Sequence, residues 1–254
     1  MPDYSLIIPA YNEAEFLPTT LAAARQAMAA ASWSGELIVV DNNSSDTTSA
    51  VALAHGADRV VFEPHNQIAR ARNAGAAASE AAWLVFVDAD TRIPPDLLQL
   101  ALKALSSDAV AGGGARVTME ERVTPMVAWL VRTWNGISRS WNYAAGSFFF
   151  CRRDAFDAAG GFEEKVYAGE EVWLARRIKA WAKARRMSFL IIDEPPVITS
   201  GRKSDWFTTG DFVRQLAILF LLPWATRSKR LCALWYRRPD AAPRGIDPDQ
   251  GPLD

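Results

Sequence analysis

The segment WLVFVDADTRIPPD, residues 83–96, places two acidic residues between an apolar run and the start of a helix. The apolar run favours a buried strand, and prolines are favoured in the first turn of a helix. Asp88 and Asp90 repel each other, and burying either carboxylate alone is unfavourable. Neither acid is needed as a helix cap, so the pair indicates a binding site rather than a simple turn.

The same alternation of apolar runs and helical patterns surrounds this segment. Strands are predicted over 4–9, 36–41, 59–62, 83–88 and 109–117, and helices over 14–31, 47–55, 69–80 and 95–105. Near-continuous apolar strands separated by helices are typical of a parallel sheet covered on both faces. We therefore expect a doubly wound, mostly parallel α/β sheet flanked by helices.

The pattern loosens past residue 118. One or two helices are predicted over 124–143, a strand over 147–151, a helix over 169–187, short strands over 188–193 and 195–199, and an amphipathic helix over 209–225. The last residues, 236–254, are rich in Pro, Asp and Gly, and this composition predicts a disordered tail.

Composition and charge argue against several classes of protein. The formal net charge of the 254 residues is −1, which gives no overall basic field for nucleic acid. Cys151, Cys232, His55 and His65 do not share a zinc-ligand spacing. The N-terminus lacks a signal-peptide pattern, so we expect a soluble, cytoplasmic protein.

Two segments keep more than one interpretation. The apolar run 216–224 is too short to span a bilayer. Together with its flanking bases, the segment 212–230 fits either packing on the domain or peripheral contact with the inner face of an anionic membrane. Trp129, Trp134 and Trp141 fit an acceptor platform, core packing or a subunit interface.

Acidic residues follow three of the predicted strands. Glu13 comes after the first strand, Asp41 ends the second, and Asp88 and Asp90 follow the fourth. Ligands of open α/β sheets collect at the carboxyl ends of the strands, where these residues would meet. Paired carboxylates suit Mn²⁺ or Mg²⁺, which share their ligand shell with substrate phosphates. Asn42, Ser44 and Asp46 are better explained as turn or cap residues.

Basic residues for an anionic ligand are available nearby, although each could equally be a solvated surface charge. The candidates are Arg70, Arg72, Arg202 and Lys203. The glycine-rich nucleotide motifs of dehydrogenases and of P-loop NTPases are missing, because PAYNEAEF follows the first strand. The run GGG at 112–114 is interpreted as a flexible turn.

Six blocks in order carry a resemblance to a known family. They are SLIIPAYNEAEFLPTTL, ELIVVDNNSSDTT, ARARNAGAAAS, WLVFVDADTRIPPDLL, GSFFFCRRDAFDAAGGF and GEEVWLARRI. This order resembles family 2 glycosyltransferases of the GT-A fold over roughly residues 4 to 180. The resemblance implies a nucleotide-diphosphate-sugar donor, Mn²⁺ or Mg²⁺, a hydroxyl acceptor that is a saccharide or lipid-linked, and inversion at the anomeric carbon.

The resemblance also implies roles for individual residues. The positions of Pro9, Ala10, Tyr11, Glu13 and Asp41 hold the nucleoside, and Asp88, Ala89 and Asp90 form the DxD motif, in which the second acid binds the metal. Arg72 and Asn73 lie near the nucleotide, and Arg70 stands where a smaller residue is usual. Residues 1–118 would form the donor half and 119–235 the acceptor half of one continuous domain.

A catalytic base is expected on the helix that begins near Gly169. On a helical period, Glu171 shares a face with the apolar Leu174, Ala175 and Ile178, and Glu170 lies about 100° away. We therefore expect Glu171 to point inward and to act as the base, with a pKa raised by desolvation. The family usually has Glu-Asp here, so Glu-Glu is a departure. Two acids could also simply favour the helix N-terminus.

Two other functions fit part of the pattern. A nucleotidyltransferase that makes nucleotide sugars can also combine a metal with a doubly wound sheet, but it would normally carry a glycine-rich, basic segment after the first strand. A non-catalytic sugar-nucleotide-binding protein would explain Glu-Glu as a loss of activity.

Overall fold

The computed structural model describes residues 1–120 and 123–201, and beyond them residues 210–211, 214–215, 218, 223–232 and 236. Its strands are β1 (Tyr4–Ala10), β2 (Gly35–Asp41), β3 (Arg59–Phe62), β4 (Trp83–Val87), β5 (Thr91–Arg92), β6 (Val110–Met119), β7 (Phe148–Arg152) and β8 (Ser188–Thr199). Its helices are α1 (Leu17–Ala30), α2 (Thr48–Ala54), α3 (Ile68–Ala78), α4 (Pro95–Leu105), α5 (Pro125–Trp141), α6 (Arg153–Ala159) and α7 (Glu170–Ala184), with 3₁₀ turns η1 (Pro223–Arg227) and η2 (Arg230–Cys232).

The strands form one mixed, mostly parallel sheet in the order β3-β2-β1-β4-β7-β6-β8-β5. β1 runs parallel to β2 and β4, and β2 runs parallel to β3. β7 is antiparallel to both β4 and β6, so Phe148 at the start of β7 lies opposite Val87 at the end of β4. The predicted fold class is confirmed.

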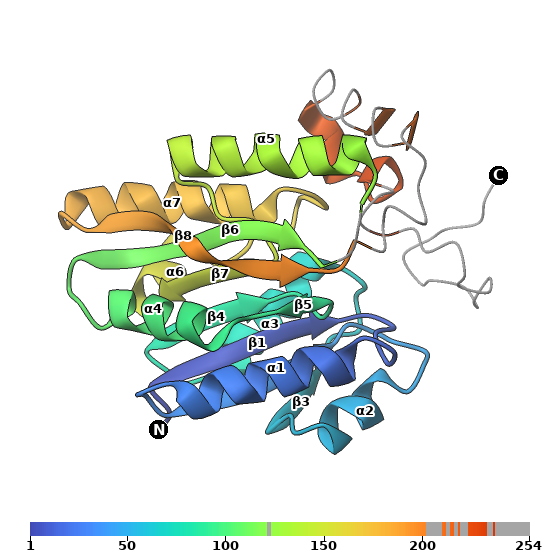
Figure 1. Cartoon of the computed structure of the whole chain (residues 1–254), viewed down its shortest axis with the longest axis horizontal. Coiled ribbons are helices and arrows are strands. Elements are labelled where there is room, and N and C mark those ends of the chain that lie inside the picture. Colours follow the sequence, from blue (N-terminus) through green and yellow to red (C-terminus); the bar gives the residue numbers. More distant parts are fainter. Residues whose placement is uncertain are drawn as a thin grey trace.

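Helices cover both faces of this sheet (Figure 1). Alternate residues of a strand point to opposite faces, and β1 divides its side chains in this way. Leu6 and Ile8 join an apolar cluster with α1 and α4, whereas Ile7 joins a second cluster with α3 and α7. The members of both clusters are buried, which explains the near-continuous apolar sequence of the central strands.

The predicted elements of the first half agree with the structure to within a few residues. In the second half, residues 125–141 form the single helix α5, and the short helix α6 was not predicted. The two strands expected over 188–193 and 195–199 are one strand, β8, whose pairing with β6 shifts register between Ile192 and Val197. Pro195 and Pro196 lie inside this shift. Proline has no backbone N–H to donate to a strand ladder, so it fits where regular pairing is interrupted.

The interpretation of the GGG run as a flexible turn is wrong. Gly112, Gly113 and Gly114 lie within β6, opposite residues of β7. A Cβ on Gly113 would lie 2.3 Å from the Leu190 carbonyl oxygen and 2.5 Å from the Phe150 ring. The glycines therefore allow close packing of adjacent strands.

Several predictions fall on residues outside the described part of the chain. The final helix over 209–225 falls there in large part, and the tail over 236–254 almost entirely. Among the described residues, no helix is long and apolar enough to cross a bilayer.

Helix α3 lies close to the sheet at Gly75. A Cβ there would lie 2.4 Å from Ile7 Cγ2 and 2.9 Å from Val40 Cγ2, whereas a Cβ on Gly136, in α5, would meet nothing within 4 Å. Alanine gains the same helix propensity at both positions, so the difference between the variants isolates the steric clash. We expect Gly75→Ala to be less stable than Gly136→Ala by about 1–3 kcal/mol in urea unfolding. Equal stabilities would show that α3 does not pack this closely.

Candidate active site

The carboxyl ends of β1 and β2 lie side by side, and their following loops are bonded to each other. Ala10 is paired with Asp41 in the strand register. The Asn12 amide donates to Ser44 Oγ at 2.9 Å, and the Glu13 amide donates to Thr48 Oγ1 at 2.9 Å. The sequence segments PAYNE and DNNSSD therefore form one connected edge, as expected from the parallel sheet.

The polar residues after β2 mainly hold this loop in shape. Asp41 is buried and its Oδ1 accepts from the Ser44 amide at 2.8 Å, while its Oδ2 accepts from the Ser49 hydroxyl. Asp46 Oδ1 accepts from the Thr48 amide at 3.0 Å, at the start of α2. The turn role predicted for Asp46 is therefore confirmed, and Asp41 is positioned rigidly at the edge of the sheet.

The Asp88-Ala89-Asp90 segment is a tight turn, in which the Thr91 amide donates to the Asp88 carbonyl at 3.1 Å. It is not extended backbone, so the two acids are not aligned in the way that alternate residues of a strand are. The turn is anchored from other elements. Ala89 is buried and its carbonyl accepts from Thr20 Oγ1 at 2.8 Å, and the Asp90 carbonyl accepts from the Ser200 amide at 3.0 Å.

Both acids of this turn are half-buried at the sheet edge. Carboxylate oxygens at such a position are the donors that Mn²⁺ and Mg²⁺ prefer, so Asp88 and Asp90 fit a divalent ion chemically. Within the described residues, no group of three or more His, Cys, Asp and Glu side chains is placed to hold a metal. An ion here would take its other ligands from phosphate oxygens or water.

Arg72, on α3, is the centre of the polar contacts at this edge. Its side chain is only 1% exposed. Nη2 donates to Asp88 Oδ1 at 2.8 Å and to the Gly146 carbonyl at 2.9 Å, and Nη1 donates to Glu170 Oε1 at 2.5 Å. The guanidinium also lies over the Phe162 ring, 5.1 Å from its centroid. Arg72 thus joins the acid turn to the N-terminus of α7.

The charge state of Arg72 follows from these contacts. Burial alone would lower its pKa, but the carboxylates of Asp88, Glu170 and Glu171 outweigh burial, so the pKa of Arg72 is raised. Arg72 is therefore a permanent buried cation, and its ion pairs persist at any pH at which the carboxylates are charged.

The relative burial predicted for the two glutamates is wrong. Glu170 is the more buried acid, at 3% exposure, and the buried Arg72 of α3 contacts its carboxylate; Glu171 is half-buried. Removal from water raises the pKa of Glu171 to about 8, with a further contribution from the Glu170 charge and an opposing one from Arg72. The sequence predicted a pKa of Glu171 that is raised by desolvation, and desolvation is the largest cause of the shift in the structure.

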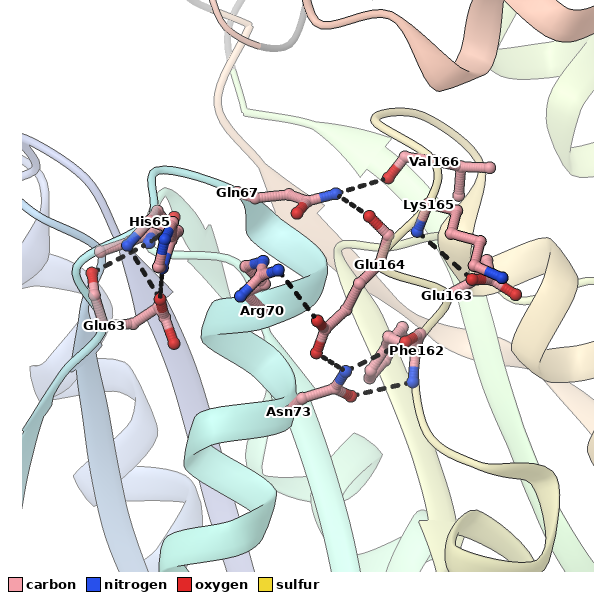
Figure 2. A network of polar contacts seen from close by, with 11 residues as sticks. Glu63, His65, Gln67, Arg70, Asn73, Phe162, Glu163, Glu164, Lys165 and Val166 are labelled. Atoms are coloured by element: carbon pink, nitrogen blue, oxygen red, sulfur yellow. Dashed lines mark hydrogen bonds and ion pairs between the residues drawn. The ribbon is translucent and has the colours of Figure 1, made fainter. Parts of the chain in front are cut away.

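A second set of contacts ties α3 to the loop that precedes α7 (Figure 2). Asn73 Nδ2 donates to the Phe162 carbonyl at 3.0 Å and to Glu164 Oε1 at 2.9 Å, and Gln67 Nε2 donates to the Val166 carbonyl at 3.0 Å. Arg70 pairs with Glu164 Oε2 at 3.5 Å. Arg70 therefore reaches this loop, whereas its neighbour Arg72 reaches the acid turn.

From the sequence, Arg72 was one of four candidate bases, and Asn73 was placed near the site only by resemblance. Gln67, Phe162 and Glu164 were not identified as candidates. These three residues belong to no periodic pattern in the sequence. They lie near the site because α3 and the loop before α7 are in contact. Arg202 and Lys203 lie outside the described residues.

The two arginines of α3 provide a matched pair of substitutions. Arg72→Met would leave Asp88 and the buried Glu170 without their shared cation, and breaking a buried ion pair typically costs about 3–5 kcal/mol. Arg70→Met would break a half-exposed pair, for which we expect a loss below about 1 kcal/mol. Chemical unfolding of both variants measures the difference. A loss for Arg72→Met no larger than that for Arg70→Met would contradict the central position assigned to Arg72.

Comparison with known proteins gives a family and a fold. The model of Glycosyl transferase family 2 matches residues 5–160. An uncharacterized glycosyltransferase of Mycobacterium bovis is 40% identical over 86 residues, which are 34% of this chain and 36% of that protein. The glycosyltransferase AglE of Haloferax volcanii is 29% identical over 191 residues, or 70% of this chain and 61% of that protein. The chain thus spans between about one third and less than two thirds of the length of these relatives.

A solved structure shares the fold over most of the chain. The mannosyltransferase PcManGT of Pyrobaculum calidifontis, solved with GDP-Man and Mn²⁺, superposes with a TM-score of 0.61 at 21% sequence identity, covering 90% of this chain and 64% of that one. The family match extends from β1 through α6 and includes the acid turn and Arg72. The chain therefore belongs to glycosyl transferase family 2.

Proposed function

We propose that this chain transfers a sugar from a nucleotide-diphosphate-sugar donor to a hydroxyl group of an acceptor, with Mn²⁺ or Mg²⁺. The observation that carries the proposal is the buried pairing of Arg72 with both Asp88 and Glu170. It brings an acidic turn suited to a metal-bound diphosphate next to a helix start with a carboxylate of raised pKa. Glycosyl transfer needs both kinds of group within reach of one bond.

The donor half of the proposed site is built from the loops after β1, β2 and β4. Tyr11 and Glu13 lie in a loop bonded to the loop that follows Asp41, so the surface offered to a nucleoside is fixed before the donor binds. Pro9 and Ala10 end β1 beside them. A preformed surface reduces the entropy lost on binding.

In this proposal Asp90 and Asp88 hold the metal ion, which would stabilise the negative charge on the departing nucleoside diphosphate. Asp88 is already oriented by Arg72 through Oδ1.

Glu171 is the proposed base and Glu170 its positioning neighbour. Glu170 is committed to the 2.5 Å contact with Arg72, so a proton acceptor for the attacking hydroxyl is better supplied by Glu171. A base that removes the acceptor proton during direct attack on the anomeric carbon gives inversion of configuration. Residues 1–118 then serve the donor, and residues 119–235 serve the acceptor.

The donor and metal are tested together by thermal unfolding of the full chain with a panel of nucleotide sugars, with and without Mn²⁺. Stabilisation that needs both ligands is expected, because only the folded state binds them; it amounts to about 2.7 kcal/mol at a hundredfold excess over Kd. Asp90→Ala should abolish the metal-dependent part. Asp96→Ala, which removes an exposed acid of α4, should retain it. Equal stabilisation of both variants would remove Asp90 from the metal site.

The base is tested by Glu171→Gln. We expect donor stabilisation to persist while release of nucleoside diphosphate with acceptor falls by about 10²–10⁴-fold. In the unsubstituted chain, a base must be deprotonated to act, so kcat/KM should rise with pH and level off above about 8, where Glu171 is ionised. Glu171→Gln should lose this rise. Full turnover in Glu171→Gln would end the assignment, and so would an unchanged pH profile.

A further inference from the structure

Helix α5 exposes large apolar side chains on one side. Trp129 is 58% exposed and Trp141 is 64% exposed, and Ile137 between them is also exposed. At about 100° per residue, Ile137 lies about 80° and Trp141 about 120° from Trp129, so the three apolar side chains spread over about a third of the circumference of α5. Val127 and Ser138, at about 160–180° from Trp129, are buried. Groups of large exposed apolar side chains mark candidate contact surfaces.

Helix α7 continues this surface. Lys179 Nζ donates to the Trp141 carbonyl at 2.7 Å and lies 4.7 Å from the centroid of the Tyr143 ring. Arg176 Nε donates to the Tyr143 hydroxyl at 3.1 Å. Trp173, near the start of α7, is exposed as well. Figure 1 shows α5 and α7 at the same end of the molecule, beside β6 and β8.

The charge of these two segments is of one sign. Residues 125–143 and 172–186 contain no acidic residue, and their basic residues are Arg132, Arg139, Arg176, Arg177, Lys179, Lys183, Arg185 and Arg186. The whole chain has a net charge of −1, so this concentration is local. Arg139 and Arg177 pair with acids of other segments, at 3.5 and 3.3 Å. Arg132, Arg176 and Lys183 are exposed on the same two helices as Trp129, Trp141 and Trp173.

We propose that this α5–α7 surface, defined by Trp129, Ile137, Trp141, Trp173 and the exposed bases beside them, docks on an anionic phospholipid bilayer. Tryptophan is favoured at the headgroup level of a bilayer, and basic side chains are attracted to its negative surface potential. The surface differs from the segment 212–230 considered from the sequence, and it is independent of the proposed reaction.

The charge of the surface argues against the other simple occupant, a second copy of the chain. A twofold contact places the same patch of both copies face to face. Here that contact would bring two sets of arginines and lysines together with no acid within either segment to compensate them, and like charges at an interface are unfavourable. An anionic surface supplies the missing charge.

The proposal is tested by co-sedimentation of the full chain with vesicles. We expect binding to vesicles of phosphatidylcholine mixed with phosphatidylglycerol, weaker binding to pure phosphatidylcholine, and weakening by salt. Trp129→Ser with Trp141→Ser should lower the partition coefficient about tenfold or more. Arg132→Gln with Lys183→Gln should lower it about 25-fold, from about fivefold for each basic residue lost.

Matched controls lie elsewhere on the molecule. Phe62→Ser, at 61% exposure on the edge strand β3, and Lys103→Gln, exposed on α4, should leave the partition coefficient unchanged. Thermal unfolding verifies that every variant is folded. The proposal is overturned if the chain fails to bind anionic vesicles, if the controls lose as much binding as the α5–α7 variants, or if the tryptophan variants only dissociate an oligomer in size-exclusion chromatography.

Discussion

The buried guanidinium of Arg72 is the interaction on which the candidate site depends. An isolated buried cation is very unfavourable, so this side chain is stable only while its carboxylate partners remain in place. Those partners, Asp88 and Glu170, come from the turn after β4 and from the start of α7. One charge therefore fixes the relative positions of three elements that are far apart in sequence.

Small residues let the backbone come close enough for these contacts. A Cβ on Gly146 would lie 2.9 Å from Arg72 Nη2, and a Cβ on Gly161 would lie 2.8 Å from Asn73 Oδ1. Gly75 allows α3 itself to rest on β1 and β2. The segment ARNAG, residues 71–75, thus contacts three parts of the molecule within about one helical turn. Arg72 contacts the acids, Asn73 contacts the loop before α7, and Gly75 packs on the sheet.

The sequence allowed the sheet and its acidic edge to be predicted, because both depend on local pattern and parallel topology. Strands that are apolar throughout must be covered on both faces, and their carboxyl ends must meet. The burial of Glu170 was not predictable in the same way. A helical wheel places Glu171 on the apolar stripe and Glu170 about 100° away from it. In the structure Glu170 is nevertheless the more buried, and it contacts Arg72 of another helix. The conformation of the acid turn likewise depends on anchors from α1 and from the residue after β8.

Arg72 also resolves the repulsion within two pairs of neighbouring acids. It contacts Asp88 of the pair Asp88 and Asp90, and Glu170 of the pair Glu170 and Glu171. In each pair one carboxylate is neutralised and held, and the other lies beside it without contacting Arg72. Removal from water and the neighbouring Glu170 charge both disfavour ionisation of Glu171, in keeping with the raised pKa of that residue. Asp90 and Glu171, to which the proposal assigns the metal and the base, are thus the two acids that Arg72 does not contact.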